Sequence, residues 1–201
     1  MKKIFLILSF VMLNSCGSAK YNYFFDTGKQ LDFSNGKWIL NRTESNSKIF
    51  DTELYYNSLR DFKKILGDSL IEMNDLRRTK LVAPKIKFDL TNSDLKKLKR
   101  ETDCDYIINI GGNVIGDGAG LISFPKQIEN SSNKASVSIS IYDLNSGILI
   151  SSSQVYGKTQ HQESIFPDDD KNIPTINPSS HMIMLKGAEK LIKKYKKNQL
   201  K

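Results

Sequence analysis

The clearest pattern in the chain is the alternation of serine with valine or isoleucine over residues 136–141. This period of two predicts a strand with one apolar and one polar face. The sequence DLNSG at residues 143–147 has the composition of a tight turn, so residues 148–156 are predicted to return as a partner strand. Residues 106–110 are instead almost continuously apolar, which is typical of an interior strand covered on both faces.

Two further strands are predicted nearer the N-terminus. Trp38 and Leu40 occupy alternate positions within the first, residues 37–43. The second covers residues 81–88, where Pro84 indicates an edge strand or a bulge because proline has no amide hydrogen to donate. The segments between the strands have the spacing of helices.

The longest helical patterns lie near the middle and at the end of the chain. Apolar side chains three or four positions apart mark one face of an amphipathic helix. The first such helix is predicted to begin at Asp51 or Thr52, and its apolar face is Tyr55, Leu59, Phe62, Leu66, Leu70 and Met73. The last is predicted to begin at Pro178 after Asn177, and its apolar face is Met184, Leu185, Ala188, Leu191, Ile192 and Tyr195.

A third helix has a well-defined start. Thr91 and Asp94 have the spacing of an N-cap and its reciprocal partner, and Leu90 and Leu95 have the spacing of a hydrophobic staple. The helix is predicted to end near Asp103. The element order is then β-α-β-α-β-β-β-α, which predicts a single α/β (α+β) domain with a mixed sheet and helices mainly on one face.

The N-terminus carries a targeting pattern. A cationic start is followed by a mostly apolar run over residues 4–13 and then by Asn14, Ser15, Cys16 and Gly17. Such a run is a secretion signal and is too short to span a bilayer. It resembles the lipobox of bacterial lipoproteins, in which the cysteine is acylated and becomes the new N-terminus.

That resemblance implies four segments. Residues 1–15 are the signal peptide, residues 16–36 a lipidated tether that begins at Cys16, residues 37–197 the domain, and residues 198–201 a tail. Several acyl chains hold a protein stably on a membrane. We therefore expect lipid anchoring in the cell envelope, at the periplasmic face of the outer membrane. A secreted protein that is not acylated is the alternative.

Three short motifs lie on the predicted elements: CDYII at residues 104–108, IYDLNSGI at residues 141–148, and the terminal helix at residues 178–197. Together they resemble a group of envelope domains. The group comprises the curli secretion channel lipoprotein, the lipoprotein activators of penicillin-binding proteins, and the N-terminal domain of TolB. The resemblance implies a non-enzymatic module that binds another envelope protein.

The chain is basic, with 30 lysines and arginines against 22 acidic residues and a net charge of +8. Seven lysines crowd the terminal helix and tail: Lys186, Lys190, Lys193, Lys194, Lys196, Lys197 and Lys201. They fit a solvated outer helix face, where cations also favour the C-terminal end of the helix dipole. A nucleic acid is therefore not expected as a partner.

No catalytic or metal-binding set is evident in the sequence. The two histidines, His161 and His181, have no G-x-S-x-G motif to accompany them, and Cys104 is expected to be a buried structural cysteine. The glycines at residues 116–120 lack phosphate-loop spacing, and the aspartates at residues 168–170 lack the glycine of a calcium loop. We expect no catalytic residues, no metal and no cofactor.

Two long irregular segments, residues 111–134 and 157–177, supply the candidate partner-binding surface. The predicted topology brings both to one end of the sheet, with the tether from Cys16 at the other end, so that this surface points away from the membrane. Its candidate residues are Phe124, Ile128, His161, Ile165 and Phe166. The alternatives are that both segments are disordered, or that the loops around His161 form a small-ligand-binding or hydrolytic site.

Overall fold

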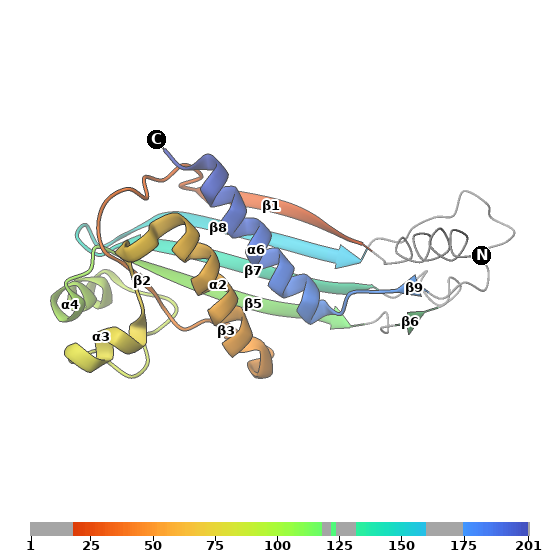
Figure 1. The fold of residues 1–201 in the computed structure, drawn as a ribbon, viewed down its shortest axis with the longest axis horizontal. Helices are drawn as coiled ribbons and strands as arrows, with labels where there is room; N and C mark the ends of the chain where they lie inside the picture. Colours follow the sequence, from red (N-terminus) through yellow and green to blue (C-terminus); the bar gives the residue numbers. More distant parts are fainter. Residues whose placement is uncertain (1–17, 118–121, 124–131, 160–174, 201) are drawn as a thin grey trace, which may run out of the picture.

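The computed structural model describes residues 18–117, 122–123, 132–159 and 175–200. Within these ranges the elements follow one another as shown in Figure 1: β1 (Ala19–Thr27), β2 (Trp38–Leu40), β3 (Glu44–Ser45), the 3-10 helix η2 (Lys48–Phe50), α2 (Asp51–Leu66), the 3-10 helix η3 (Gly67–Ser69), β4 (Leu70–Ile71), α3 (Met73–Thr79), α4 (Asn92–Thr102), β5 (Tyr106–Asp117), β6 (Ile122–Ser123), β7 (Asn133–Asp143), β8 (Ile148–Thr159), β9 (Thr175–Ile176) and α6 (Ser180–Asn198).

The strands form a mixed seven-stranded sheet in the order β1-β8-β7-β5-β2-β4, in which β3 also pairs with β5. The pairs β1–β8, β8–β7 and β7–β5 are antiparallel, whereas β5, β2 and β4 run parallel to one another. Because parallel strands need crossover connections, helices lie between β2, β4 and β5 in the chain. The predicted class, one mixed α/β domain, is confirmed.

The two long helices cover one face of the sheet. In Figure 1, α2 and α6 lie side by side across the strands, and α6 contacts β5, β7 and β8. Ile108 pairs with Ile141 and Ile110 with Ile139, and all four side chains are buried beneath these helices. Trp38 is also buried there and stacks on Tyr106 with ring centroids 4.1 Å apart. This face holds the main core.

A smaller core lies on the opposite face at one end of the sheet. Ile39 and Ile107 alternate with residues of the main core, so their side chains point to the other face, where they pack against α3 and α4. The capping box predicted for α4 is present, since Thr91 accepts a hydrogen bond from the Asp94 amide and the Asp94 carboxylate accepts one from the Thr91 amide. The helix ends as predicted, with Asp103 in the left-handed region at φ 57°.

The predicted helix that begins at residue 51 stops earlier than expected. It ends at Leu66, because Gly67 adopts φ +56°, a conformation that glycine accepts at little cost. Leu70, expected on the helix, instead lies in β4 and pairs with Trp38, and Met73 begins α3. The last helix begins slightly later than predicted, since Ser179 rather than Asn177 is its N-cap.

The strand predicted over residues 81–88 is wrong. These residues form no strand, and β4 takes the place of the third parallel strand. Leu81 is 97% exposed, whereas Ile86 is buried against α3 and α4. The Arg77 guanidinium donates hydrogen bonds to the carbonyls of Ala83 and Pro84, which holds this segment as a covering loop.

The sheet extends further than the sequence predicted. Residues 111–117 continue β5, and residues 133–134 begin β7, although both were expected to be irregular. Gly112 makes this possible, because a Cβ atom there would lie 2.5 Å from Met184 Sδ on α6. Beyond these strands β6 pairs with β9, so these parts of the two predicted irregular segments converge, as expected.

Residues 16–36 were predicted to be a tether, but Ala19–Thr27 is the edge strand β1. Tyr21, Tyr23 and Phe25 alternate toward the helix side and pack against the main core. Lys190 and Lys194 of α6 lie over the Tyr21 and Tyr23 rings at 5.1 Å and 4.9 Å. The aromatic alternation therefore makes this segment part of the sheet.

The position of β1 also corrects the predicted orientation. Ala19 pairs with Thr159, so the chain arriving from Cys16 reaches the sheet at the end where the two irregular segments leave it. The prediction that it enters at the opposite end is wrong, because β1 runs antiparallel to β8. Among the residues that the structure describes, no helix is long and apolar enough to cross a bilayer.

Candidate functional site

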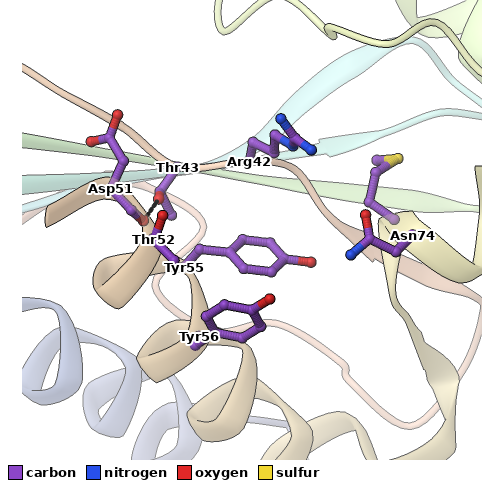
Figure 2. A pocket seen from close by; sticks show the side chains of 8 residues that line it. Arg42, Thr43, Asp51, Thr52, Tyr55, Tyr56 and Asn74 are labelled. Atoms are coloured by element: carbon purple, nitrogen blue, oxygen red, sulfur yellow. Dashed lines mark hydrogen bonds between the residues drawn. The ribbon is translucent and has the colours of Figure 1, made fainter. Parts of the chain in front are cut away.

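A pocket of about 310 Å³ lies between α2, the segment after β2 and the start of α3. Figure 2 shows its lining: Arg42, Thr43, Asp51, Thr52, Tyr55, Tyr56, Met73 and Asn74. The lining combines two aromatic rings, charges of both signs, and hydroxyl and amide groups.

The pocket is held in shape by the end of β2. The Asn41 amide donates a hydrogen bond to the Ile108 carbonyl, which continues the pairing with β5 for one residue beyond the strand. The Thr43 hydroxyl then donates to the Asp51 carbonyl at 2.7 Å, the dashed line in Figure 2. This bond fixes the start of α2 against the sheet. Arg42 lies at the edge of the pocket, between Asn41 and Thr43, which these two hydrogen bonds hold in place.

The two tyrosines project from α2 into the pocket (Figure 2). Their ring centroids are 5.3 Å apart in an edge-to-face arrangement. Tyr55 is half-buried, and burial raises the pKa of its hydroxyl, with the negative charge of Glu72 acting in the same direction. Tyr56 is 56% exposed, so a large aromatic surface remains open at the mouth of the pocket.

Charges of opposite sign lie at different sides of the pocket. The Arg42 guanidinium makes no ion pair with residues in the described ranges, and its charge helps to lower the pKa of Arg77, after the larger effect of burial. The Asp51 carboxylate is already engaged, because the Ser45 hydroxyl donates to it at 2.5 Å and Lys48 Nζ lies 3.8 Å away. The cationic side is therefore the one that can take a new partner.

A serine and a histidine meet outside this pocket. The Ser47 hydroxyl lies 2.9 Å from His181 Nε2, and the imidazole stacks on Phe50 at 3.9 Å. In the part of the chain that the structure describes, no carboxylate contacts this histidine, so the third member of a catalytic triad is lacking there. The contact joins the start of α6 to η2.

The described residues also contain no group of three or more histidine, cysteine, aspartate or glutamate side chains that could hold a metal ion. Cys104 is fully buried, as predicted, and burial raises the pKa of its thiol. A thiol of this kind is a structural group rather than a nucleophile.

The residues that the sequence analysis proposed for function all lie outside the described ranges. These are the lipidation site Cys16 and the candidate partner-binding residues Phe124, Ile128, His161, Ile165 and Phe166. Their roles stay predictions, as does the alternative of a ligand-binding or hydrolytic site around His161.

The pocket was not predicted from the sequence. Tyr55 was expected on the apolar face of a helix, and no role was expected for Arg42, Tyr56 or Asn74. The adjacent pair Tyr55-Tyr56 was a usable indication, because two consecutive helical residues lie about 100° apart and cannot both face the core. The approach of Arg42 and Asn74 depends on tertiary structure and has no counterpart in the sequence pattern.

No protein-family model matches the chain, and no curated protein matches it. Several solved structures are distantly similar. The PelC dodecamer from Paraburkholderia phytofirmans has a TM-score of 0.47 at 9% identity, over 89% of this chain and 94% of that chain. The hypothetical protein CT253 from Chlamydia trachomatis has a TM-score of 0.40 at 10% identity, over 81% of this chain and 94% of that one.

Escherichia coli LpoB, an activator lipoprotein of a penicillin-binding protein, is also similar to the chain, with a TM-score of 0.37 at 13% identity over 63% of this chain and 58% of that chain. LpoB is one of the penicillin-binding-protein activators, which form part of the group of envelope domains that the sequence motifs resemble. These likenesses describe the course of the backbone, and they carry no function to this chain.

Proposed function

We propose that this protein is a lipoprotein anchored through Cys16, at the periplasmic face of the outer membrane, and that its domain binds another envelope protein without catalysing a reaction. The anchor rests on the sequence around Cys16. The observation that carries the binding role is the pocket in which Arg42, whose guanidinium makes no ion pair with any described residue, lies beside Tyr55 and Tyr56.

This combination suits protein recognition. Tyrosine and arginine are enriched among the residues that dominate the energy of protein interfaces. A guanidinium binds a carboxylate through two parallel hydrogen bonds, and a tyrosine supplies apolar area together with a hydroxyl. We therefore propose that an acidic side chain of the partner binds Arg42 while an adjacent apolar group covers Tyr56.

The segments that carry Phe124, Ile128, His161, Ile165 and Phe166 are a second proposed part of the partner-binding surface. Since β1 begins at the end of the sheet where these segments leave it, this part would lie close to the anchor. The pocket lies farther along the domain, at the junction of β2 and α2.

Crosslinking in intact cells, followed by co-purification with the tagged full-length chain, tests the binding role. Arg42→Ala and Tyr56→Ala should each reduce the recovered partner by about tenfold or more, the loss expected for a residue that dominates an interface. The matched controls are Arg100→Ala and Phe24→Ala, which remove an exposed arginine and an exposed aromatic elsewhere. Equal recovery from all four variants would contradict the proposal.

Metabolic labelling with a fatty-acid analogue tests the anchor. Cys16→Ala should abolish labelling and leave either the precursor or a released domain, because the acyl chains supply the membrane affinity. Cys104→Ala removes the other cysteine, which is buried, and should retain the label. Labelling that persists in Cys16→Ala would show that the anchor lies elsewhere.

A further inference from the structure

Three lysines stand side by side across three neighbouring strands. In the sheet register Lys20 of β1 lies opposite Lys158 of β8, and Lys158 lies opposite Lys134 of β7. Residues directly opposite in antiparallel strands have Cβ atoms about 4.5–5.5 Å apart, and like charges there are destabilising. We call Lys20, Lys158 and Lys134 the lysine row.

The lysine row points away from the helices. The next position on each of the three strands faces α6: Tyr21 lies under Lys190, a Cβ atom on Gly157 would meet Ile183, and Ala135 is in the main core. Successive residues of a strand point to opposite faces, so the lysines point to the face that α2 and α6 leave open. Lys20 and Lys158 are exposed, and Lys134 is half-buried.

No carboxylate within residues 18–117, 122–123, 132–159 and 175–200 forms an ion pair with a member of the lysine row. Some exposed lysines are paired, as Lys37 is with Asp103 at 3.1 Å, and others are not. What distinguishes the lysine row is that three like charges lie on adjacent strands, and such a cluster of positive charge favours the binding of an external anion.

The position of the row identifies that anion. Ala19, the first residue of β1, is three positions after Cys16 in the sequence, and three extended residues span at most about 10 Å. An acylated Cys16 therefore holds the backbone of Lys20, one position further on, within about 14 Å of the lipid headgroups, and the length of the lysine side chain brings its charge to about one Debye length from them. A greater distance between the sheet and the headgroups would require the first residues of β1 to detach from β8.

We propose that the lysine row binds the anionic phospholipid headgroups of the membrane that holds Cys16, and so orients the domain with this end of the sheet against the membrane. This inference rests on the proposed anchor. Each lysine near an anionic surface shifts the equilibrium toward contact by about five-fold. The C-terminal end of α6, with Lys196 and Lys197, is then on the side away from the membrane.

The test uses the full acylated chain, reconstituted into vesicles of phosphatidylcholine with phosphatidylglycerol or of phosphatidylcholine alone. A fluorophore is placed by Asn22→Cys next to the lysine row, or by Gln30→Cys beyond the far end of β1, both exposed positions. Lipids with a nitroxide on the headgroup quench a nearby fluorophore. Because the anchor alone keeps position 22 nearer the membrane, we expect somewhat stronger quenching at position 22 than at position 30 in phosphatidylcholine alone, and a difference several-fold larger in the anionic vesicles.

Charge reversal of the row supplies the decisive variant. Lys20→Glu, Lys134→Glu and Lys158→Glu together should reduce the difference in the anionic vesicles to the size that it has in phosphatidylcholine alone, or below it. The control combines Lys29→Glu, Lys196→Glu and Lys197→Glu, which changes the net charge equally at the far end and should preserve the difference. Lys20→Gln, Lys134→Gln and Lys158→Gln together remove the repulsion between the lysines, so this variant should fold at least as well as the parent chain. It should also reduce the difference in the anionic vesicles to the size that it has in phosphatidylcholine alone.

A difference between the two positions that is the same in both kinds of vesicle, or that charge reversal leaves unchanged in the anionic vesicles, would overturn the inference. The intact mass of the same preparation reports acylation. An acylated chain with the same difference in both kinds of vesicle contradicts the orientation alone, whereas a chain without acyl groups contradicts the proposed anchor and this inference together.

Discussion

The two faces of the sheet differ in composition, and the difference follows the helices that cover them. Beneath α2 and α6 most side chains are apolar and fully buried, as at Ile108, Ile139 and Ile141. On the opposite face the same strands carry serine, as at Ser138 and Ser140, which is only partly buried. A strand is therefore apolar on each face only to the extent that a helix covers it.

Strand β5 runs from a part of the sheet that helices cover on both faces to a part that they cover on one face only. Near its start α4 covers the second face, and Ile107 is as fully buried there as Ile108 is on the first. Two residues later the second face carries Asn109, whose side-chain amide donates to the Phe88 carbonyl at 2.6 Å. The apolar residues 106–108 thus mark the part of the sheet that helices cover on both faces.

Among the substitutions that test this difference between the two faces, truncation of the buried isoleucines should change the stability most. Ile107→Ala and Ile108→Ala should each lower the free energy of unfolding by about 2–5 kcal/mol, and so should Ile139→Ala, because each leaves a cavity in a closed core. Urea denaturation measures all three. A small loss for Ile107→Ala alone would show that α4 does not cover the second face.

Removal of one hydroxyl tests the polar cluster inside the helical face. Tyr195 Oη lies 2.7 Å from both Ser151 Oγ and Ser153 Oγ, and all three side chains are buried. Tyr195→Phe leaves two buried serines without this partner and should cost about 1–3 kcal/mol. Thermal unfolding at neutral pH measures the loss, and an unchanged midpoint would mean that the serines find other partners.

The stability of the protein should depend on pH through Asp105, which lies at the end of the sheet just before β5. The Asp105 carboxylate accepts hydrogen bonds from Lys99 Nζ and the Lys37 amide, and these lower its pKa to about 2, with Asn145 contributing less. A lowered folded-state pKa stabilises the protein above about pH 4, and this contribution is lost as the pH falls from about 4 to 2.

We expect Asp105→Asn to remove on the order of 1 kcal/mol at pH 7, since the carboxylate is partly exposed, and to weaken the dependence on pH between 4 and 2. Urea melts across this range, compared with the parent chain, measure the difference. Parallel stability curves for the two proteins would contradict the assignment to Asp105.

The smallest effect is expected on the open face. Ser138 is half-buried, so Ser138→Ala should change the free energy of unfolding by about 0.5 kcal/mol or less. Measured beside Ile139→Ala, its neighbour on the other face, this variant gives the sharpest contrast in the sheet. Similar losses for the two would mean that the assigned facing is wrong.

Local chemistry explains what the sequence could predict. The Thr91–Asp94 capping box lies within four residues, and the serine–isoleucine alternation of β7 depends on the pleat of one strand, so neither requires knowledge of distant contacts. Both were predicted correctly. The alternation of Tyr21, Tyr23 and Phe25 was an equally local pattern, but it was not recognised as the strand that it forms.

Tertiary contacts explain what the sequence could not predict. Strand β4 has only two residues, too few for any period, and Leu70 continues the helical spacing of α2. The loop over residues 81–88 has the composition of a strand but is held by hydrogen bonds from Arg77. The candidate pocket likewise depends on Arg42 and Asn74 meeting across separate elements.

Strand β1 also determines when the sheet can be completed. It is near the start of the chain, but its partner β8 is near the end, and Ser152 reaches Asp26 across 126 positions of sequence. Pairing so distant in sequence forms late in folding, because a long loop must close first. In the lipoprotein that we propose, Cys16 would therefore be acylated before β1 is paired, and the later docking of β1 onto β8 would shorten the distance between the finished domain and the membrane.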